Sequence, residues 1–298
     1  MPLLSPKEVI TRGLKYAKVS VKSKWKLERL EDEFHAQYGS DSTSVAMVWY
    51  HISEKDDLTK IEKKKGLSRL LMAMHFLWAY NRNCKELGRK FNVCDNYAKG
   101  CYLWKWIERI HALSADKIMW SHELDDPDGP TNVIWVDAVD MSTWEKKHPT
   151  LPKDPKNFTH KYNGAGVKYQ VVVAVHLARV VGIYGPYLGA VSDKKILKLS
   201  GVLDKLKDGK MAVVDKGYIN HALKDKLSWP NPHEAPEVSQ YKSRIRMRGE
   251  TFNGRVKYFK ILRECFRHNL KYHKLAFTAV AVIVQYQMDY GMAPLYSV

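Results

Sequence analysis

The sequence predicts an α/β fold, in which a mixed sheet with flanking helices follows an all-α N-terminal region. Residues 1–120 show the apolar spacing of helices and almost no strand pattern. Residues 121–131 are polar, acidic and turn-forming, which is typical of a linker. Strand patterns begin abruptly at residue 132. We therefore expect a helical region over 1–120, a linker over 121–131 and an α/β domain over 132–298.

The N-terminal region contains two clear helical patterns. Apolar residues repeat at helical spacing from Leu70 to Trp78 and from Leu103 to Ile110. Within residues 84–111, a short helix, a turn at 91–93 and a second helix capped by Asp95 give the outline of a helix-turn-helix, whose second helix would enter the major groove of DNA. Any αα-hairpin has the same outline, so a DNA-reading unit and a purely structural hairpin both stay open.

The second region alternates strands with helices. The expected strands are, in order, 132–136, 171–177, 180–185 and 211–214, with a tight hairpin turn at Ala178-Arg179. Ser192 is expected to cap a helix that runs through Leu206 and ends at Gly209.

The last part of the chain is expected to be a loop followed by a helix. Residues 219–242 contain several prolines and are interpreted mainly as a loop. From Ser243 the pattern is helical to the low 280s, with an interruption around 267–269. Three antiparallel strands, a crossover helix and a further strand are the outline of an RNase H-like sheet.

Composition limits the classes of partner. The chain has 298 residues and a formal net charge of +17, which favours a polyanion such as nucleic acid; an anionic membrane surface, or charge that only keeps the protein soluble, is the alternative. The composition excludes a disordered or collagen-like chain. No apolar run is long enough to cross a bilayer and no signal-peptide pattern is seen, so we expect a soluble intracellular protein. The four cysteines are too scattered for a disulfide framework or an obvious zinc site.

Two acidic residues directly follow apolar strand patterns. Asp137 comes after the strand at 132–136, and Asp215 comes after the strand at 211–214. A single acid at a strand end is common, but a pair on neighbouring strands sits on rigid backbone at a sheet edge, where catalytic groups often lie.

A third acid, Glu250, lies in the basic helix expected after Ser243. Four residues turn a helix by about 400° and seven by about 700°, so Arg246, Glu250 and Lys257 share one face. An exposed ion-pair ladder would look similar, but basic residues far outnumber acidic ones over 243–274, which suits a phosphate backbone lying along the helix. Gly249 and Gly254 weaken this helix and would let other backbone or DNA approach closely.

The three acids predict a metal site. A set of carboxylates without histidine or thiolate ligands favours Mg²⁺, or Mn²⁺ in its place. A pair of such ions about 4 Å apart activates a water or a 3′-hydroxyl and stabilises the leaving oxygen in phosphodiester cleavage.

At these residues the sequence resembles the Harbinger-type transposases, which belong to the DDE superfamily and have an RNase H-like nuclease core. The most specific matching segments are VVDKGY (213–218) and RGETFNGRVKYFKILRECFRH (248–268); weaker ones are VDAVD (136–140), KYNGAGVKYQVVV (161–173), GPYLGAVSD (185–193) and MDYGMAPLYSV (288–298). The resemblance implies that Asp137, Asp215 and Glu250 are the catalytic, metal-binding triad. The sequence also resembles the Tyr–Arg–Glu–Lys signature of bacterial insertion-sequence transposases: Arg246, Glu250 and Lys257 match it, and Ser243 stands in place of the tyrosine.

The chain departs from the family pattern near the first acid. Ala138 replaces the usual glycine, Asp140 stands where a histidine is frequent, and Ser192-Asp193 replaces a His-Asp pair. Asp140 is therefore a competing first ligand, although Asp137 and Asp140 should point to opposite faces of a continuing strand and we favour Asp137. Asp193 is expected to start a helix close to the site, and a role as a secondary ligand is the alternative.

The resemblance implies a DNA transposase that hydrolyses transposon ends and transfers the freed strand to target DNA. Its expected partners are double-stranded DNA, further copies of the same chain on that DNA and a Myb-like DNA-binding protein, and its expected location is the nucleus. Phosphate contacts are expected from Arg246, Arg248, Arg255, Lys257 and Lys260. The alternatives are a domesticated or inactive copy that binds DNA without cutting, and a general RNase H-like nuclease.

Overall fold

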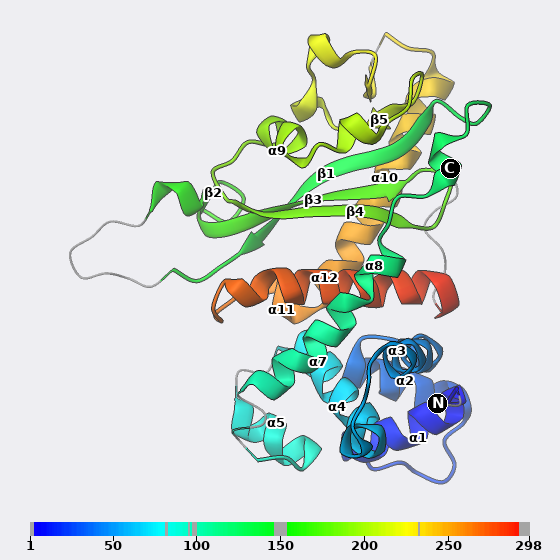
Figure 1. Ribbon diagram of the computed structural model, residues 1–298, viewed down its shortest axis with the longest axis vertical. Coiled ribbons are helices and arrows are strands. Elements are labelled where there is room, and N and C mark those ends of the chain that lie inside the picture. The colour runs from blue at the N-terminus through cyan, green and yellow to red at the C-terminus, as the bar shows by residue number, and fades with distance from the viewer. Residues whose placement is uncertain are drawn as a thin grey trace. The chain divides into compact units, whose positions relative to one another are not determined.

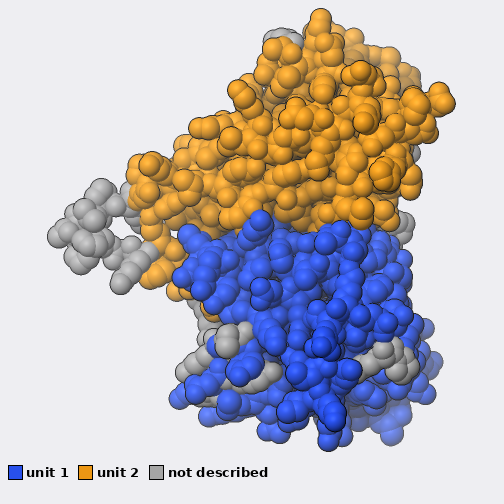
Figure 2. Space-filling view, viewed as in Figure 1, with its two compact units in different colours: residues 1–117, 256–264, 269–293 blue, residues 118–255, 265–268, 294–298 orange. Residues whose placement is uncertain are grey.

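The computed structural model describes residues 3–80, 83–94, 96, 100–145, 154–231 and 233–291 (Figure 1). The chain divides into two compact units, shown in different colours in Figure 2. Unit 1 comprises Met1–Lys117, Val256–Glu264 and Asn269–Ala293, and unit 2 comprises Ile118–Arg255, Cys265–His268 and Pro294–Val298. The nuclease domain expected over 132–298 therefore has residues in both units.

Among its described residues, unit 1 contains helices and connecting turns but no named strand. Its N-terminal helices are α1 (Pro6–Tyr16), α2 (Leu27–Tyr38), α3 (Ser42–Lys55), α4 (Lys60–Ala79), α5 (Cys84–Phe91), α7 (Cys101–Ala112) and α8 (Ser114–Lys117). Capping boxes fix the start of α1, through Ser5 and Glu8, and of α4, through Thr59 and Glu62. The all-α N-terminal region predicted from apolar spacing is confirmed.

The C-terminal helices complete unit 1. The short helix α11 (Lys260–Arg263) contacts α4, whereas α12 (Lys271–Tyr286) packs against α3 and α7 and is continued by the π-helical turn η6 (Gln287–Gly291). The stretch from Ala276 to Tyr286 is buried along its whole length. The ring of Tyr272 stacks on Trp104 with centroids 4.3 Å apart, and Gln287 donates a hydrogen bond of 2.7 Å to the carbonyl of Gly39. Helix α12 is thus part of the core of unit 1.

The candidate helix-turn-helix lies in the same core. The apolar residues of α7 that repeat at helical spacing, Leu103, Trp106, Ile107 and Ile110, are buried as predicted, and the exposed residues form a narrow stripe. On that side of α7, Lys105 and Arg109 pair with Glu62 of α4 at 3.2 and 2.8 Å. Asp95, the expected cap, lies outside the described residues. These contacts fit a structural hairpin, and DNA reading by residues 84–111 stays a prediction.

Unit 2 is built on a mixed sheet of β1 (Asn132–Ser142), β2 (Phe158–Thr159), β3 (Gly164–Ala174), β4 (Val180–Leu188), β5 (Met211–Val213) and β6 (Leu227–Ser228). The order is β2-β3-β1-β5-β6, and β4 also pairs with β3. β3 pairs antiparallel with both β1 and β4. β5 is parallel to β1, and β6 is parallel to β5. This arrangement confirms the predicted RNase H-like sheet with flanking helices.

Strand boundaries differ from the sequence prediction. β1 runs six residues past the expected end at 136, and β3 begins seven residues before the expected start at 171. The first half of β3 contains Gly164, Gly166 and Lys168, so it lacks a clear apolar alternation. The hairpin turn lies at 175–179, closed by the bond from the Ala174 amide to the Arg179 carbonyl, rather than at 178–179. The two-residue strands β2 and β6 are too short to leave a periodic signal.

Helix boundaries also differ. Helix α9 (Asp193–Ser200) starts after Ser192 as expected but ends at Gly201, whose φ of 64° is left-handed, and a 3₁₀ turn, η3 (Val202–Lys205), follows. Helix α10 (Pro236–Tyr258) starts seven residues before Ser243, because Pro236 fits the first turn of a helix. The expected long helix is broken at Phe259, whose backbone is extended.

The sheet of unit 2 is covered on both faces, by α9 on one and α10 on the other (Figure 1). The core under α9 is formed by apolar side chains, including Val133, Ile134, Val136, Val172, Ala174, Leu197, Val202, Ala212 and Val214. On the opposite face, a Cβ added to Gly249 of α10 would lie 2.2 Å from the Trp135 ring. The absence of a side chain at Gly249 therefore lets the backbone of α10 pack directly against the ring of Trp135 on β1.

Among the described helices, none combines the length and apolarity that a membrane span requires.

The two glycines of α10 should respond in opposite ways to replacement by alanine. Gly249→Ala is expected to destabilise the protein by about 1–3 kcal/mol, because the new methyl group overlaps Trp135. Gly254→Ala is the matched control: nothing lies within 4 Å of its added Cβ, so the gain in helix propensity should stabilise by about 0.5–1 kcal/mol. Urea unfolding followed by circular dichroism measures both, and equal effects would contradict the close packing of α10 on β1.

Candidate active site

Asp137 and Asp215 come together through the pairing of two parallel strands. The register of β1 with β5 ends at Trp135 opposite Val213, and Asp137 and Asp215 each lie two residues further along. Side chains two residues apart on a strand point to the same face, so both acids follow the face of Trp135. The expectation that Asp137 ends its strand is wrong, because β1 continues to Ser142; it is the pairing with β5 that stops beside Asp137.

Asp215 is held where β5 gives way to a turn. Its backbone is extended, with φ −75° and ψ 160°, and it caps the 3₁₀ turn η4 (Lys216–Tyr218). The Tyr218 amide donates to the Asp215 carbonyl at 2.9 Å, which fixes the turn. The side chain of Asp215 is 41% exposed, although its Oδ1 atom is buried.

Helix α10 supplies the partners of both acids. Arg246 and Asn253 lie three residues before and four residues after Gly249, so both project from the face of α10 that contacts β1. Asn253 donates from Nδ2 to Oδ2 of Asp137 at 3.2 Å. Nε of Arg246 lies 2.6 Å from Oδ1 of Asp215.

Glu250 joins this group through Arg246. An Nη atom of Arg246 lies 3.5 Å from Oε1 of Glu250, one helical turn away, and the Glu250 side chain is 60% exposed. Arg246 thus contacts two of the three predicted acids, and Asn253 contacts the third. The structure brings all three acids to the junction of β1, β5 and α10.

The electrostatics of the site are those of crowded carboxylates. Burial, together with the charges of Asp215 and Asp193, raises the pKa of Asp137 to about 7, although the Ala138 amide and Lys161 oppose the shift. Burial, with a contribution from the same acids, also raises the pKa of Tyr218, so its hydroxyl stays protonated. The ionised form of Asp137, beside the other carboxylates, is therefore stabilised by a nearby cation.

The donor set fits a hard divalent cation, although its members are not gathered into a metal-binding cluster. Among the described residues, no three His, Cys, Asp or Glu side chains lie close enough together to hold a metal ion. Arg246 already contacts the oxygens of Asp215 and Glu250. Oδ1 of Asn253 is buried without a hydrogen-bond partner and adds an amide oxygen beside Asp137. Carboxylate and amide oxygens are the ligands that Mg²⁺ and Mn²⁺ prefer.

Asp140 and Asp193 form a separate cluster on the other face of β1. The register between β1 and β3 is unbroken from 134 to 142, which confirms that Asp137 and Asp140 point to opposite faces. Lys168 of β3, opposite Asp140, lies 4.0 Å from Oδ1 of Asp140 and 3.0 Å from Oδ1 of Asp193. Asp193 is the first residue of α9, as expected. Because Lys168 neutralises this pair, the geometry favours Asp137 as the first ligand.

The predicted phosphate-binding residues differ in exposure and position. Arg246 is 36% exposed beside the acids, whereas Arg248 is only 6% exposed and lies in the interior, so its expected contact with DNA finds no support. Arg255 is partly exposed in unit 2. Lys257 and Lys260 belong to unit 1, where Lys260 is exposed.

Sequence reasoning missed Asn253 and Tyr218. Asn253 follows Glu250 by three residues, and helical spacing alone places these two side chains side by side. Its position before Gly254 instead resembles a turn signal. Tyr218 ends the VVDKGY segment, but nothing in that pattern indicates that its ring is buried near the acids.

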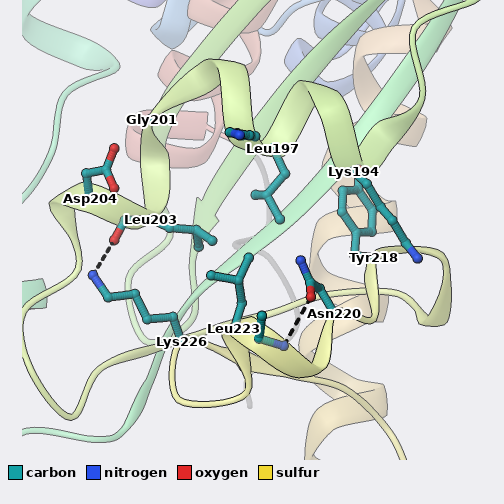
Figure 3. A pocket seen from close by; sticks show the side chains of 11 residues that line it. Lys194, Leu197, Gly201, Leu203, Asp204, Tyr218, Asn220, Leu223 and Lys226 are labelled. Carbon is teal, nitrogen blue, oxygen red and sulfur yellow. Dashed lines mark hydrogen bonds between the residues drawn. The ribbon is translucent and has the colours of Figure 1, made fainter.

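A cavity of about 580 Å³ opens beside this site (Figure 3). Its lining combines Leu197, Leu203 and Leu223 with basic side chains of α9 and of Lys226. The three predicted acids are not among its lining residues, but Tyr218 is. The cavity is therefore a neighbour of the candidate site and shares one wall with it.

Residues 139–285 match the family model described as DDE superfamily endonuclease. The match includes Asp215 and Glu250 and begins two residues after Asp137. No curated protein and no solved structure matches the chain. The RNase H-like strand order and the acids at the junction of β1, β5 and α10 agree with this family. Residues 139–285 are thus similar to the DDE superfamily endonucleases.

Proposed function

We propose that this protein is a DNA transposase of the Harbinger type, which cuts transposon ends and joins them to target DNA with two divalent metal ions. One observation carries the proposal: a single helix, α10, bears Glu250 and contacts both Asp137 and Asp215 on neighbouring parallel strands. The family match supports the nuclease class, and the net charge of +17 supports a DNA substrate.

Asp137, Asp215 and Glu250 would hold the ions, which are Mg²⁺ or, in its place, Mn²⁺. Ions in such a site activate the attacking oxygen and stabilise the leaving oxygen. In the first step the oxygen of water bonds to phosphorus and the bond from phosphorus to the 3′-oxygen breaks, which leaves a 3′-hydroxyl and a 5′-phosphate. In the second step that 3′-hydroxyl attacks a phosphodiester of the target and displaces a target 3′-oxygen.

Other residues of the chain orient the Asp137 carboxylate, fix the position of α10 and would bind DNA. Asn253 fixes the rotation of the Asp137 carboxylate through its hydrogen bond, and packing of Gly249 on Trp135 keeps α10 at this distance. Arg246, Arg255, Lys257 and Lys260 would bind phosphates of the DNA.

Transposition further requires partners that follow from the proposed family. We expect double-stranded DNA, both transposon ends and target, as substrate, a homo-oligomer assembled on it, a Myb-like protein that reads the ends, and action in the nucleus. DNA binding without cleavage would instead indicate an inactive or domesticated copy. Cleavage that does not depend on a terminal repeat would indicate a general RNase H-like nuclease.

Replacement of Asp215 by Asn should abolish cleavage. The amide keeps the size of the side chain but removes the charge that a divalent ion needs, so nicking of a supercoiled plasmid in Mg²⁺ should fall by roughly a thousandfold or more. DNA affinity, measured by fluorescence anisotropy, should stay within about threefold of the wild type, because phosphate contacts come mainly from basic side chains. Unchanged nicking by Asp215→Asn would remove the mechanism.

The choice between Asp137 and Asp140 can be decided with a matched pair of variants. Asp137→Asn should lose nicking as completely as Asp215→Asn does. Asp140→Asn should retain it within about tenfold, because Asp140 faces Lys168 on the opposite side of β1. The reverse result would assign the first ligand to Asp140, and thermal unfolding of both variants checks that each is folded.

A further inference from the structure

We propose that Arg246 is a positioning residue that couples metal binding to DNA binding. Its guanidinium contacts Asp215 and Glu250; when a divalent cation binds these acids, the guanidinium leaves them and binds a DNA phosphate. This inference rests on the proposed function, because it requires that the acids bind a metal ion.

The first step of the argument is that Arg246 occupies the oxygens that the metal needs. Its Nε lies 2.6 Å from Oδ1 of Asp215, and an Nη atom lies 3.5 Å from Oε1 of Glu250. A guanidinium presents several N–H donors in one plane, so one group serves two carboxylates. Arg246 therefore acts as a resident cation at the junction of the two acids.

The second step is that Arg246 and a metal ion exclude each other. Mg²⁺ binds oxygen at about 2.1 Å, so an ion on the same oxygen of Asp215 would stand within a few ångströms of the guanidinium. Two cations at that distance repel strongly, and arginine does not lose its proton to relieve the repulsion. The guanidinium must therefore move away from the acids.

The third step is that Arg246 is free to move. Its side chain is 36% exposed, and its partners Asp215 and Glu250 are 41% and 60% exposed. The contacting atoms, Nε of Arg246 and Oδ1 of Asp215, are buried, but neither makes a hydrogen bond. The pair with Glu250 lies at the surface, where ion pairs are weak, so a divalent ion can replace both contacts. Exposed Arg244 and Met247 flank Arg246 along α10, so the displaced side chain can turn toward solvent.

The final step is that the displaced guanidinium of Arg246 has a new partner in the DNA. A guanidinium binds phosphate through paired hydrogen bonds, and a DNA strand at the acids would bring a phosphate within its reach. Since coupling between two ligands is reciprocal, metal should strengthen DNA binding, and DNA should strengthen metal binding by the same factor.

The test compares the full-length wild type with Arg246→Gln and with Arg244→Gln, which removes an exposed charge from the same helix. Mn²⁺ affinity without DNA is measured by electron paramagnetic resonance. The affinity for a short labelled duplex is measured by anisotropy with and without Mg²⁺ at constant ionic strength, before cleavage products appear on a gel.

In the wild type, Mg²⁺ should tighten DNA binding by about fivefold or more. Arg246→Gln should reduce this effect to less than about twofold, and it should bind Mn²⁺ about three to ten times more tightly because its competitor is gone. Arg244→Gln should weaken DNA binding in both conditions and keep the full effect of Mg²⁺. Arg246→Lys, which keeps the charge, should restore part of the coupling.

The outcomes separate this inference from the proposed function. If Arg246→Gln binds Mn²⁺ no more tightly than the wild type, or keeps the full Mg²⁺ effect on DNA binding, the role of Arg246 is overturned while the metal site stands. If the wild type binds no Mn²⁺, or if Asp215→Asn binds it as well as the wild type does, the proposed function and this inference both fall.

Discussion

The close packing of α10 on β1 is the constraint on which the candidate site depends. Glycine at 249 lets the helix backbone reach the ring of Trp135, where any Cβ would overlap it. With that contact fixed, the helical repeat alone determines what the neighbouring side chains meet. Arg246, one turn before the contact, reaches Asp215, and Asn253, one turn after it, reaches Asp137. A larger residue at 249 would lift both partners away from the acids together.

The sheet provides the other half of this geometry. Because β5 is short, its pairing with β1 stops at Val213, and the chain turns at Asp215 while β1 continues. Asp137 consequently lies within a strand, whereas Asp215 is half-exposed at a turn, although the two are neighbours. This difference explains why burial shifts the pKa of Asp137 strongly, and why it is Asp215 that receives the counter-charge from Arg246.

Much of the fold could be predicted from the sequence, because it follows from local apolar patterns. The helical N-terminal region and the succession of β1, β3, β4, α9 and β5 along the chain follow from such patterns. The first half of β3 could not be predicted, since its glycines and Lys168 hide the alternation. Helical spacing places Asn253 beside Glu250, but its hydrogen bond to Asp137 could not be predicted, because it depends on the distance between α10 and β1. That distance depends on Gly249 meeting Trp135, a contact between residues far apart in the sequence.

Helix α12 belongs to unit 1, so the composition break at 121–131 does not separate the two units completely. A break in composition at 121–131 suggests that the helical region could stand alone. Yet the core of unit 1 includes α12, whose buried face packs against α3 and α7. A fragment of residues 1–120 would expose those apolar faces to water, at a cost of about 25 cal/mol for each Å². The helical region therefore shares its core with α12, and the strand carrying Asp137 lies between these two parts in the sequence.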